Sequence, residues 1–154
     1  MTIKVGINGF GRMGRLSFRA AFDWDDVEFV KINDPAGDAP TLAHLITFDS
    51  VHGRWHHEAS TEGSDIIVNG ARISCTQNIA IEDTDWSGCD VVIEASGKMK
   101  KAALLQAYLD QGVKRVVVTA PVKEDGVLNV VMGVNHHLYD KQVHPIVTAA
   151  SCTT

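Results

Sequence analysis

Three glycines near the N-terminus have the spacing that dinucleotide binding requires. Gly9, Gly11 and Gly14 form a G-x-G-x-x-G motif between a β-rich run and a helical pattern. In that setting the first glycine permits a tight turn, the second lets the backbone approach a pyrophosphate, and the third lets the helix pack closely on the strand. The N–H groups that open the helix lack intrahelical partners and would point towards the anion. The motif predicts a nucleotide-binding turn, with an ordinary glycine turn as the alternative.

An acidic residue extends this prediction to a particular cofactor. Asp34 closes a second β-rich run, residues 27–33, and lies 20 residues after Gly14. At that spacing a carboxylate can accept hydrogen bonds from the hydroxyls of an adenosine ribose. A carboxylate would also repel a 2′-phosphate, so the sequence favours NAD over NADP. The alternative is that Asp34 and Pro35 only form a turn, but the glycine motif in register favours cofactor binding.

Cys152 is the candidate nucleophile. It follows the last expected strand directly, in the run Ala150-Ser151-Cys152-Thr153-Thr154. Serine and threonine would cap a helix here, and a helix N-terminus favours the nucleophilic thiolate. From the spacing alone, an ordinary cysteine near a frayed terminus is the alternative. Cys75 and Cys89 are predicted to be structural, because they lie in or beside expected strands.

The elements that must position these residues follow an alternating pattern. It predicts an α/β fold of the Rossmann type, a doubly wound, mainly parallel sheet with helices on both faces and an inserted antiparallel hairpin. The expected elements are strand 3–8, helix 12–22, strand 27–33, helix 41–48, hairpin 65–75, strand 91–94, helix 99–111 and strands 115–119, 128–132 and 145–148. Ligands of such sheets bind beyond the carboxyl ends of the strands. We therefore expect one edge to gather the glycine motif, Asp34, residues 95–97, Thr119 and Cys152.

Some local details can also be predicted. The side of the first helix that faces the sheet is expected to consist of Met13, Leu16, Ser17 and Ala20. Thr41 is the expected N-cap of the second helix, and an Asn69-Gly70 turn should close the hairpin. Residues 49–64 lose the alternating pattern, and residues 49–55 are expected to form a polar loop.

The bulk properties limit the function classes. At 154 residues, the chain suits one domain with its own core. A net charge of −5 without a basic stripe argues against nucleic acid as a partner. No apolar run reaches the ~18 residues of a membrane helix, and the N-terminus enters a strand directly, so neither a membrane segment nor a signal peptide is expected. Three cysteines without paired spacing favour the reducing cytoplasm.

The histidine-rich stretches do not predict a metal site. His52, His56 and His57 cluster in the sequence, as do His136 and His137. Neither cluster has a cysteine or acidic partner that would complete a recognisable ligand set. Solvated or hydrogen-bonded histidines are therefore expected, and no metal.

Five motifs together closely resemble those of the phosphorylating, NAD-dependent glyceraldehyde-3-phosphate dehydrogenase family. They occur in the family's order and spacing and cover the whole chain, as Val5–Arg15, Ile32–Pro35, Phe48–Gly53, Val131–His136 and Ala150–Thr154. The resemblance implies NAD as the cofactor. It also implies that residues 1–150 are the Rossmann domain and that residues 151–154 begin a catalytic domain whose remainder is absent.

The resemblance also assigns roles to residues. It implies that NAD is bound by Asn8, Gly9, Phe10, Gly11, Arg12, Met13, Asn33, Asp34, Pro35, Gln77, Ser96, Gly97 and Thr119. Cys152 would attack the aldehyde of glyceraldehyde 3-phosphate, and hydride transfer to NAD would leave a thioester that inorganic phosphate cleaves. Ser151 and Thr153 would flank the nucleophile in the substrate and phosphate sites. The full-length enzyme would be a homotetramer.

The chain also departs from the family pattern. Residues 77–80 replace an acidic-basic pair beside the adenine, and the other departures are Ala95, Met99 and Ala149. They indicate a divergent branch. The first 55 residues resemble the dehydrogenases that accompany arsenate-efflux systems, in which arsenate takes the place of phosphate.

Other functions stay open at this stage. The family's catalytic histidine and its substrate-phosphate arginine follow the cysteine motif, so residues 1–154 alone are expected to bind NAD with little or no activity. One alternative is an erythrose-4-phosphate dehydrogenase, and another is a stand-alone NAD-binding module without catalysis. A third is a dehydrogenase of the aspartate-semialdehyde type, against which Asn8–Arg15 and Ser151–Thr154 count.

Overall fold

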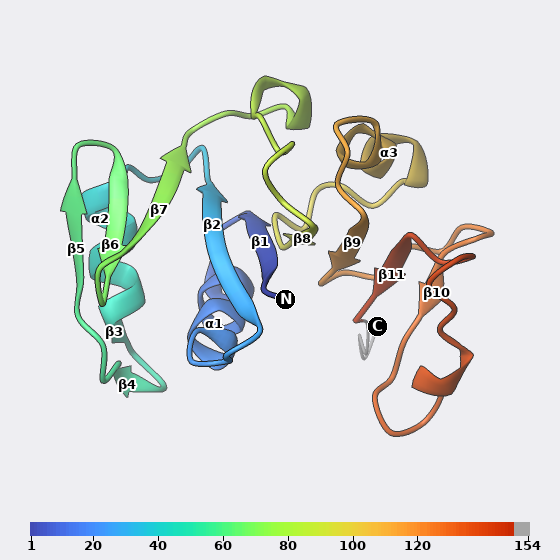
Figure 1. Ribbon diagram of the computed structural model, residues 1–154, viewed down its shortest axis with the longest axis horizontal. Helices are drawn as coiled ribbons and strands as arrows, with labels where there is room; N and C mark the ends of the chain where they lie inside the picture. The colour runs from blue at the N-terminus through green and yellow to red at the C-terminus, as the bar shows by residue number, and fades with distance from the viewer. Residues whose placement is uncertain (150–154) are drawn as a thin grey trace.

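A nine-stranded sheet runs through the protein, with its strands in the order β10-β11-β9-β8-β1-β2-β7-β6-β5 (Figure 1). The computed structural model describes residues 1–149. Neighbouring strands are parallel from β10 to β7, whereas β7, β6 and β5 pair antiparallel. The strands of this sheet are β1 (Ile3–Asn8), β2 (Val27–Asn33), β5 (Ala59–Glu62), β6 (Asp65–Val68), β7 (Ala71–Thr76), β8 (Val91–Glu94), β9 (Arg115–Val118), β10 (Leu128–Asn129) and β11 (Ile146–Thr148). The other elements are helices α1 (Arg12–Ala21), α2 (Ala39–Thr47) and α3 (Ala102–Asp110), the 3₁₀ turns η1 (Ile81–Asp83) and η2 (His136–Leu138), and a separate pair β3 (Phe48–Asp49) and β4 (Gly53–Arg54).

The order of the strands changes direction at β1. From β1 the sheet extends through β2 and β7 on one side, and through β8, β9 and β11 on the other. Such a switch point leaves a crevice at the carboxyl ends of the two central strands. The Rossmann-type fold that the alternating pattern predicts is therefore confirmed.

Two apolar clusters cover opposite faces of the sheet. Along β8, Val91 and Ile93 pack against a cluster that contains residues of α1 and α2, whereas Val92 belongs to a cluster that contains residues of α3. Successive side chains of a strand point to opposite faces, so helices lie on both sides of the sheet, as predicted.

Helix α1 turns a different side to the sheet from the one expected. Its buried residues are Gly14 and Phe18, whereas Met13 is 55% exposed. The ring of Phe18 is fully buried, and its centroid lies 4.6–5.9 Å from those of Phe10, Phe22, Phe29 and Trp55. The contacts of Phe18 with these rings determine which side of α1 faces the sheet. Because the four rings lie outside α1, the sequence of the helix alone does not predict this orientation.

Several element boundaries differ from the prediction for reasons visible in the structure. Helix α2 begins at Ala39 because the carboxylate of Asp38 accepts a hydrogen bond from Thr41 N at 3.0 Å, so Asp38 rather than Thr41 is the cap. Helix α3 begins at Ala102 rather than at residue 99, and Ala102 N donates to the distant carboxylate of Glu124 at 2.6 Å.

The strand expected at residues 128–132 also ends early, at Asn129. Beyond it, Val131 N donates to Oδ1 of Asn135 at 2.7 Å, and this turn replaces further pairing with β11.

The predicted hairpin is present and is longer than expected. Its strands β6 and β7 join through Asn69 and Gly70, whose φ angles of 50° and 80° fit a type I′ turn. Strand β5 adds a third antiparallel strand within residues 49–64, where no strand is predicted. The sequence of β5, Ala-Ser-Thr-Glu, has no apolar alternation, so no pattern signals it.

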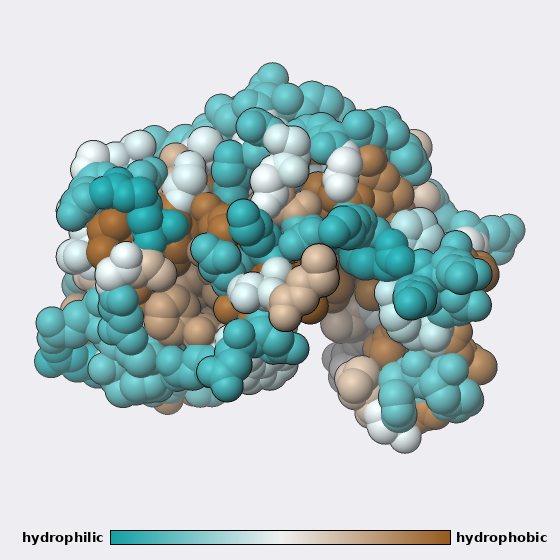
Figure 2. Space-filling view, in the orientation of Figure 1, coloured by the Kyte–Doolittle hydropathy of each residue, from teal (hydrophilic) through white to brown (hydrophobic). Residues whose placement is uncertain are grey.

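Figure 2 shows a mostly hydrophilic face with small apolar areas, and a notch that separates the main body from a lobe containing β10 and η2. This lobe exposes the large apolar side chains of Val131, Met132, Val134, Leu138, Tyr139 and Val143. Within residues 1–149, no helix is both long enough and apolar enough to cross a membrane.

The aromatic cluster around Phe18 should be a main source of stability. We expect Phe18→Ala to lower the free energy of unfolding by about 3–5 kcal/mol, because it leaves a cavity among four rings. Met13→Ala, on the exposed side of the same helix, should change it by less than about 0.5 kcal/mol. Chemical denaturation of both variants checks this, and equal effects would contradict the packing described for α1.

Candidate cofactor-binding site

A cleft of about 490 Å³ lies at the carboxyl ends of the central strands, at the switch point of the sheet. It is lined by residues at or after the carboxyl ends of β1, β2, β7 and β8, namely Asn8, Gly9, Gly11, Asp34, Pro35, Ala36, Asn78, Ile79, Ala95, Ser96, Lys98 and Met99. Four loops from one edge of the sheet therefore converge on this cleft, which is where the strand pattern predicts a ligand.

Gly9 brings two of these loops into direct contact. Its φ is 89°, and a Cβ atom at this position would lie 2.4 Å from Ser96 N and 2.5 Å from Ser96 Cα. No side chain fits there, because both neighbouring atoms belong to the backbone. The turn after β1 can therefore lie against the turn after β8 only with glycine at this position.

The other two glycines of the motif have different environments. A Cβ on Gly14 would lie 2.1 Å from the carbonyl oxygen of Gly9, so helix α1 contacts the turn at this point. A Cβ on Gly11 would have no neighbour within 4 Å, and no side chain caps the first N–H groups of α1. Gly11 therefore leaves open space before an uncapped helix N-terminus, which is the environment that a pyrophosphate requires.

Asp34 holds the glycine turn in place. Its Oδ2 accepts a hydrogen bond from Phe10 N at 2.6 Å, and its Oδ1 accepts one from Ala36 N at 2.8 Å. Each carboxylate oxygen can accept more than one hydrogen bond, so Asp34 keeps capacity for ribose hydroxyls. The residue predicted to select the cofactor also fixes the loop that would bind it.

A buried polar network lies beneath the cleft. The register of the sheet places Asn8 opposite Asn33 on one side and opposite Glu94 on the other. Asn8 Nδ2 donates to Glu94 Oε2 at 2.8 Å and to the Tyr108 hydroxyl at 2.7 Å, and Asn8 Oδ1 accepts from Asn33 Nδ2 at 2.8 Å. Glu94 also accepts hydrogen bonds from Tyr108 and from the backbone and hydroxyl of Ser96. Burial, followed by the charge of Glu94, raises the pKa of Tyr108 above its usual range.

Asn33 connects this network to the loop after β7. Its Oδ1 accepts hydrogen bonds from Thr76 Oγ1 at 2.7 Å and from Asn78 N at 2.9 Å, and its Nδ2 donates to Asn78 O at 2.9 Å. Asn8 and Asn33 are predicted to bind NAD. In the structure their side chains bond to each other and to groups at the neighbouring strand ends.

The structure places the predicted residues in several environments. Asn8, Gly9, Gly11, Asp34, Pro35 and Ser96 line the cleft. Phe10 is buried in the core, Arg12 bonds to Asp49 at 3.1 Å, and Met13 is exposed on α1. Gly97 follows the cleft residue Ser96, and Thr119 follows the last residue of β9, but neither lines the cleft. Gln77 lines a separate hollow. Ser151, Cys152 and Thr153 lie outside the described residues.

Six residues that line the cleft are not in the predicted NAD-binding set, namely Ala36, Asn78, Ile79, Ala95, Lys98 and Met99. Ala36 follows Asp34 and Pro35, so it could have been included as part of the same turn. Lys98 also lines the cleft and brings a positive charge to it. Its position directly after the Ala95-Ser96-Gly97 strand end was the signal that it belongs to the site.

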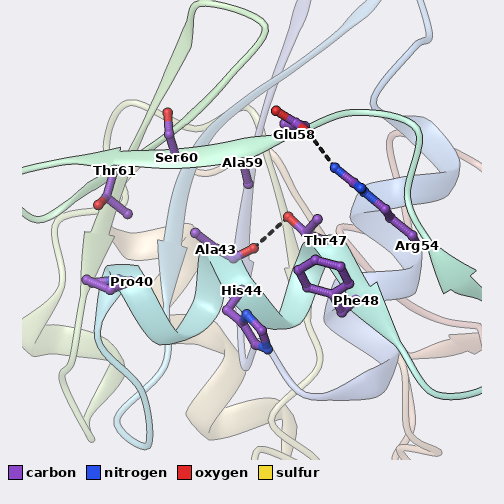
Figure 3. A pocket seen from close by; sticks show the side chains of 10 residues that line it. All are labelled: Pro40, Ala43, His44, Thr47, Phe48, Arg54, Glu58, Ala59, Ser60 and Thr61. Carbon is purple, nitrogen blue, oxygen red and sulfur yellow. Dashed lines mark hydrogen bonds and ion pairs between the residues drawn. The ribbon is translucent and has the colours of Figure 1, made fainter.

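A second hollow, of about 370 Å³, lies between α2 and β5 (Figure 3). Its wall contains the hydrogen bond from Thr47 Oγ1 to the Ala43 carbonyl and the ion pair of Arg54 with Glu58. It shares no residue with the cleft, and no glycine is among the residues that line it.

Two glycine variants should separate folding from binding. Gly14→Ala should lower the free energy of unfolding by about 1–3 kcal/mol, because its methyl group would clash with the Gly9 carbonyl. Gly11→Ala should leave stability unchanged and weaken NAD binding by about tenfold, because its methyl group fills the space left for the pyrophosphate. Denaturation and calorimetric titration measure the two effects. Unchanged NAD affinity in Gly11→Ala would contradict the assignment.

The acid stability of the protein should depend on Asp49. Hydrogen bonds from His52 N and Val51 N, followed by the charge of Arg12, lower the pKa of Asp49 from 3.8 to about 2. A lowered pKa contributes stability that is complete above about pH 4 and is lost as the pH falls through about 2. The difference in stability between the wild type and Asp49→Asn should therefore shrink over this range. A constant difference between pH 5 and pH 2 would contradict this account.

Comparisons with known proteins agree with the geometry. Residues 3–102 match the family described as glyceraldehyde 3-phosphate dehydrogenase, NAD binding domain, and this range contains every residue that lines the cleft. The chain is 51% identical to glyceraldehyde-3-phosphate dehydrogenase 3 of Nostoc sp., 44% identical to the glyceraldehyde-3-phosphate dehydrogenase of Geobacillus stearothermophilus and 42% identical to glyceraldehyde-3-phosphate dehydrogenase 1 of Bacillus subtilis.

Each of these three comparisons covers 100% of this chain and 46% of the relative, so the chain spans about half the length of the curated relatives it matches. The prediction of NAD as the cofactor is confirmed by the family. With its glycine turn, its acidic residue after β2 and its cleft at the switch point, the chain belongs to the family of glyceraldehyde-3-phosphate dehydrogenase NAD-binding domains.

Proposed function

We propose that this chain supplies the NAD-binding half of a phosphorylating glyceraldehyde-3-phosphate dehydrogenase. The observation that carries the proposal is similarity to such dehydrogenases over the full length of the chain, together with a cleft built for a dinucleotide. Residues 1–150 then form the cofactor domain, and residues 151–154 begin the catalytic domain. The complete enzyme acts as a homotetramer in the cytoplasm.

The proposed reaction uses Cys152 as the nucleophile. Its thiolate adds to the aldehyde carbon of glyceraldehyde 3-phosphate and forms a thiohemiacetal, with Ser151 and Thr153 beside it. NAD, held at the glycine turn and Asp34, would supply the hydride acceptor for that carbon. A base outside residues 1–154 would take the hydroxyl proton, and a thioester on Cys152 would remain. Inorganic phosphate, or arsenate in its place, then attacks the thioester carbonyl and releases the thiolate.

The end of the sheet supports this placement of the nucleophile. Strand β11 is parallel to β9, β8 and β1, so its carboxyl end lies at the same edge as the cleft. Ala149 follows β11 and donates a backbone hydrogen bond to Val118 O at 2.9 Å. Cys152 comes three residues later in the sequence.

The other two cysteines are poorly suited to nucleophilic attack. Burial raises the pKa of Cys75 from 9.0 to about 11, and burial likewise raises the pKa of Cys89 to about 11. Both thiols therefore stay protonated at neutral pH, and only a thiolate is an effective nucleophile. This supports their predicted structural role.

The lobe with β10 and η2 supports a role within a longer protein. Six large apolar side chains are exposed from Val131 to Val143, which is unusual for a surface that contacts only water. We therefore expect residues 1–154 by themselves to bind NAD without oxidising the aldehyde. Turnover of glyceraldehyde 3-phosphate by that piece alone would overturn this part of the proposal.

A cysteine comparison tests the chemistry in the full-length enzyme. Cys152→Ser should reduce aldehyde oxidation by at least about 10³-fold and leave NAD affinity unchanged, because the thiol forms the covalent intermediate but does not bind the cofactor. The matched control Cys75→Ala should keep the activity. Brief alkylation at neutral pH, read by peptide mass, should modify Cys152 first. Activity retained in Cys152→Ser, or alkylation of Cys75 first, would contradict the proposal.

A further inference from the structure

We propose that Asp23, His56 and His57 form a binding site for a divalent transition-metal ion with the ligand preferences of Zn²⁺. The spacing in the sequence predicts no complete ligand set around these histidines, because the neighbouring Glu58 pairs with Arg54 and the acidic partner, Asp23, lies 33 residues away from His56. The potential ligand atoms of all three side chains lie within 4.8 Å of one another.

The three side chains already converge on one point. Asp23 lies in the turn after α1, and its two carboxylate oxygens face two neighbouring imidazoles. Oδ1 is 2.7 Å from His57 Nε2, and Oδ2 is 3.2 Å from His56 Nε2. The chain bends at residues 56–57, so that adjacent side chains, which would diverge in a strand, lie on the same side.

These separations fit a tetrahedral ion. With ligand bonds of about 2.0–2.1 Å, a tetrahedral Zn²⁺ ion holds its ligand atoms about 3.3 Å apart. An ion can therefore replace the protons that now bridge the carboxylate and the two rings with only small movements of the side chains. Two imidazoles and one carboxylate are a ligand set that Zn²⁺ uses when its fourth position is open to water.

The surroundings hold one ligand firmly and leave the site open to solvent. His57 is only 15% exposed, and its ring packs against those of Phe22 and Trp55 at centroid separations of 5.1 and 4.7 Å. Asp23 and His56 are 55% and 67% exposed, so an ion and its water ligand have access. The site therefore combines a fixed ligand with two accessible ones.

Asn69 provides a partner for the second nitrogen of His57. Its side-chain amide lies 2.9 Å from His57 Nδ1. A metal on Nε2 requires Nδ1 to carry the proton, and a half-turn of the amide presents the Asn69 oxygen as its acceptor. Such a hydrogen bond fixes the tautomer and the orientation of a metal-bound imidazole.

The proposed site is separate from the cofactor cleft. The turn after α1 leads into the start of β2, and Asn69 precedes the start of β7, so the site lies at the amino ends of these parallel strands. The cleft lies at their carboxyl ends and shares no residue with it. A bound ion would tie together the turn after α1 and the β4–β5 connection, and would stabilise this edge of the domain by mass action.

The test is a titration of Zn²⁺ into the full-length protein without an affinity tag, followed by competition with a chromophoric chelator. All proteins carry Cys152→Ser, so that the proposed reactive thiol cannot compete for the ion. We expect one Zn²⁺ per chain, a raised melting temperature, and affinity that falls at least about tenfold in Asp23→Asn, His56→Ala and His57→Ala. NAD affinity should stay the same in all of them.

The control is His137→Ala, which removes one imidazole from the other adjacent pair, His136 and His137, and should bind Zn²⁺ unchanged. If His57→Ala unfolds, Zn²⁺ affinity is compared in the Asp23 and His56 variants alone, because both of these side chains are largely exposed. Wild-type affinity in those variants, or loss of binding only in His137→Ala, would overturn the proposal. So would the absence of a stoichiometric site in the parent protein.

Discussion

The buried carboxylate of Glu94 holds together the strand ends on which the cofactor cleft rests. It is 1% exposed, and it accepts hydrogen bonds from the Asn8 amide, the Tyr108 hydroxyl and two groups of Ser96. All of these partners are donors, so the acceptor capacity of the carboxylate is used inside the protein. Removing such a buried group would leave several donors unsatisfied, and each would cost about 1–3 kcal/mol. The network therefore fixes β1, β8 and α3 relative to one another.

The glycine turn depends on this arrangement. Because Glu94 holds the backbone of Ser96, the turn after β8 lies in a fixed position beside Gly9, where any added side chain would collide with it. From the other side, Asp34 holds the turn through Phe10 N. The glycine turn, which is proposed to face the pyrophosphate, is thus positioned before any ligand binds, and this lowers the entropic cost of binding.

Sequence reasoning found the features that depend on local patterns. The spacing of the three glycines and Asp34 predicts a nucleotide-binding turn, and the alternation of buried strands with helices predicts the fold. The Asn69-Gly70 turn was equally clear, because few other residue pairs adopt its backbone angles.

The features that were missed depend on contacts between distant segments. Glu124 marks the start of α3 from 22 residues away, and the rings around Phe18 set the rotation of α1. Asp23 lies beside two histidines that are 33 and 34 residues away from it in the sequence. Asn8 and Asn33 are predicted to bind NAD, but only the sheet register shows that their side chains bond to each other.

The most direct test of the central claim is a crystal structure of the full-length protein with NAD. The account predicts the pyrophosphate at the N-terminus of α1, against Gly9 and Gly11, with the adenosine ribose within hydrogen-bonding distance of Asp34. The side chains of Asn8, Glu94 and Tyr108 should keep the hydrogen bonds described here. NAD bound in the hollow between α2 and β5, or a network that rearranges to admit the cofactor, would contradict it.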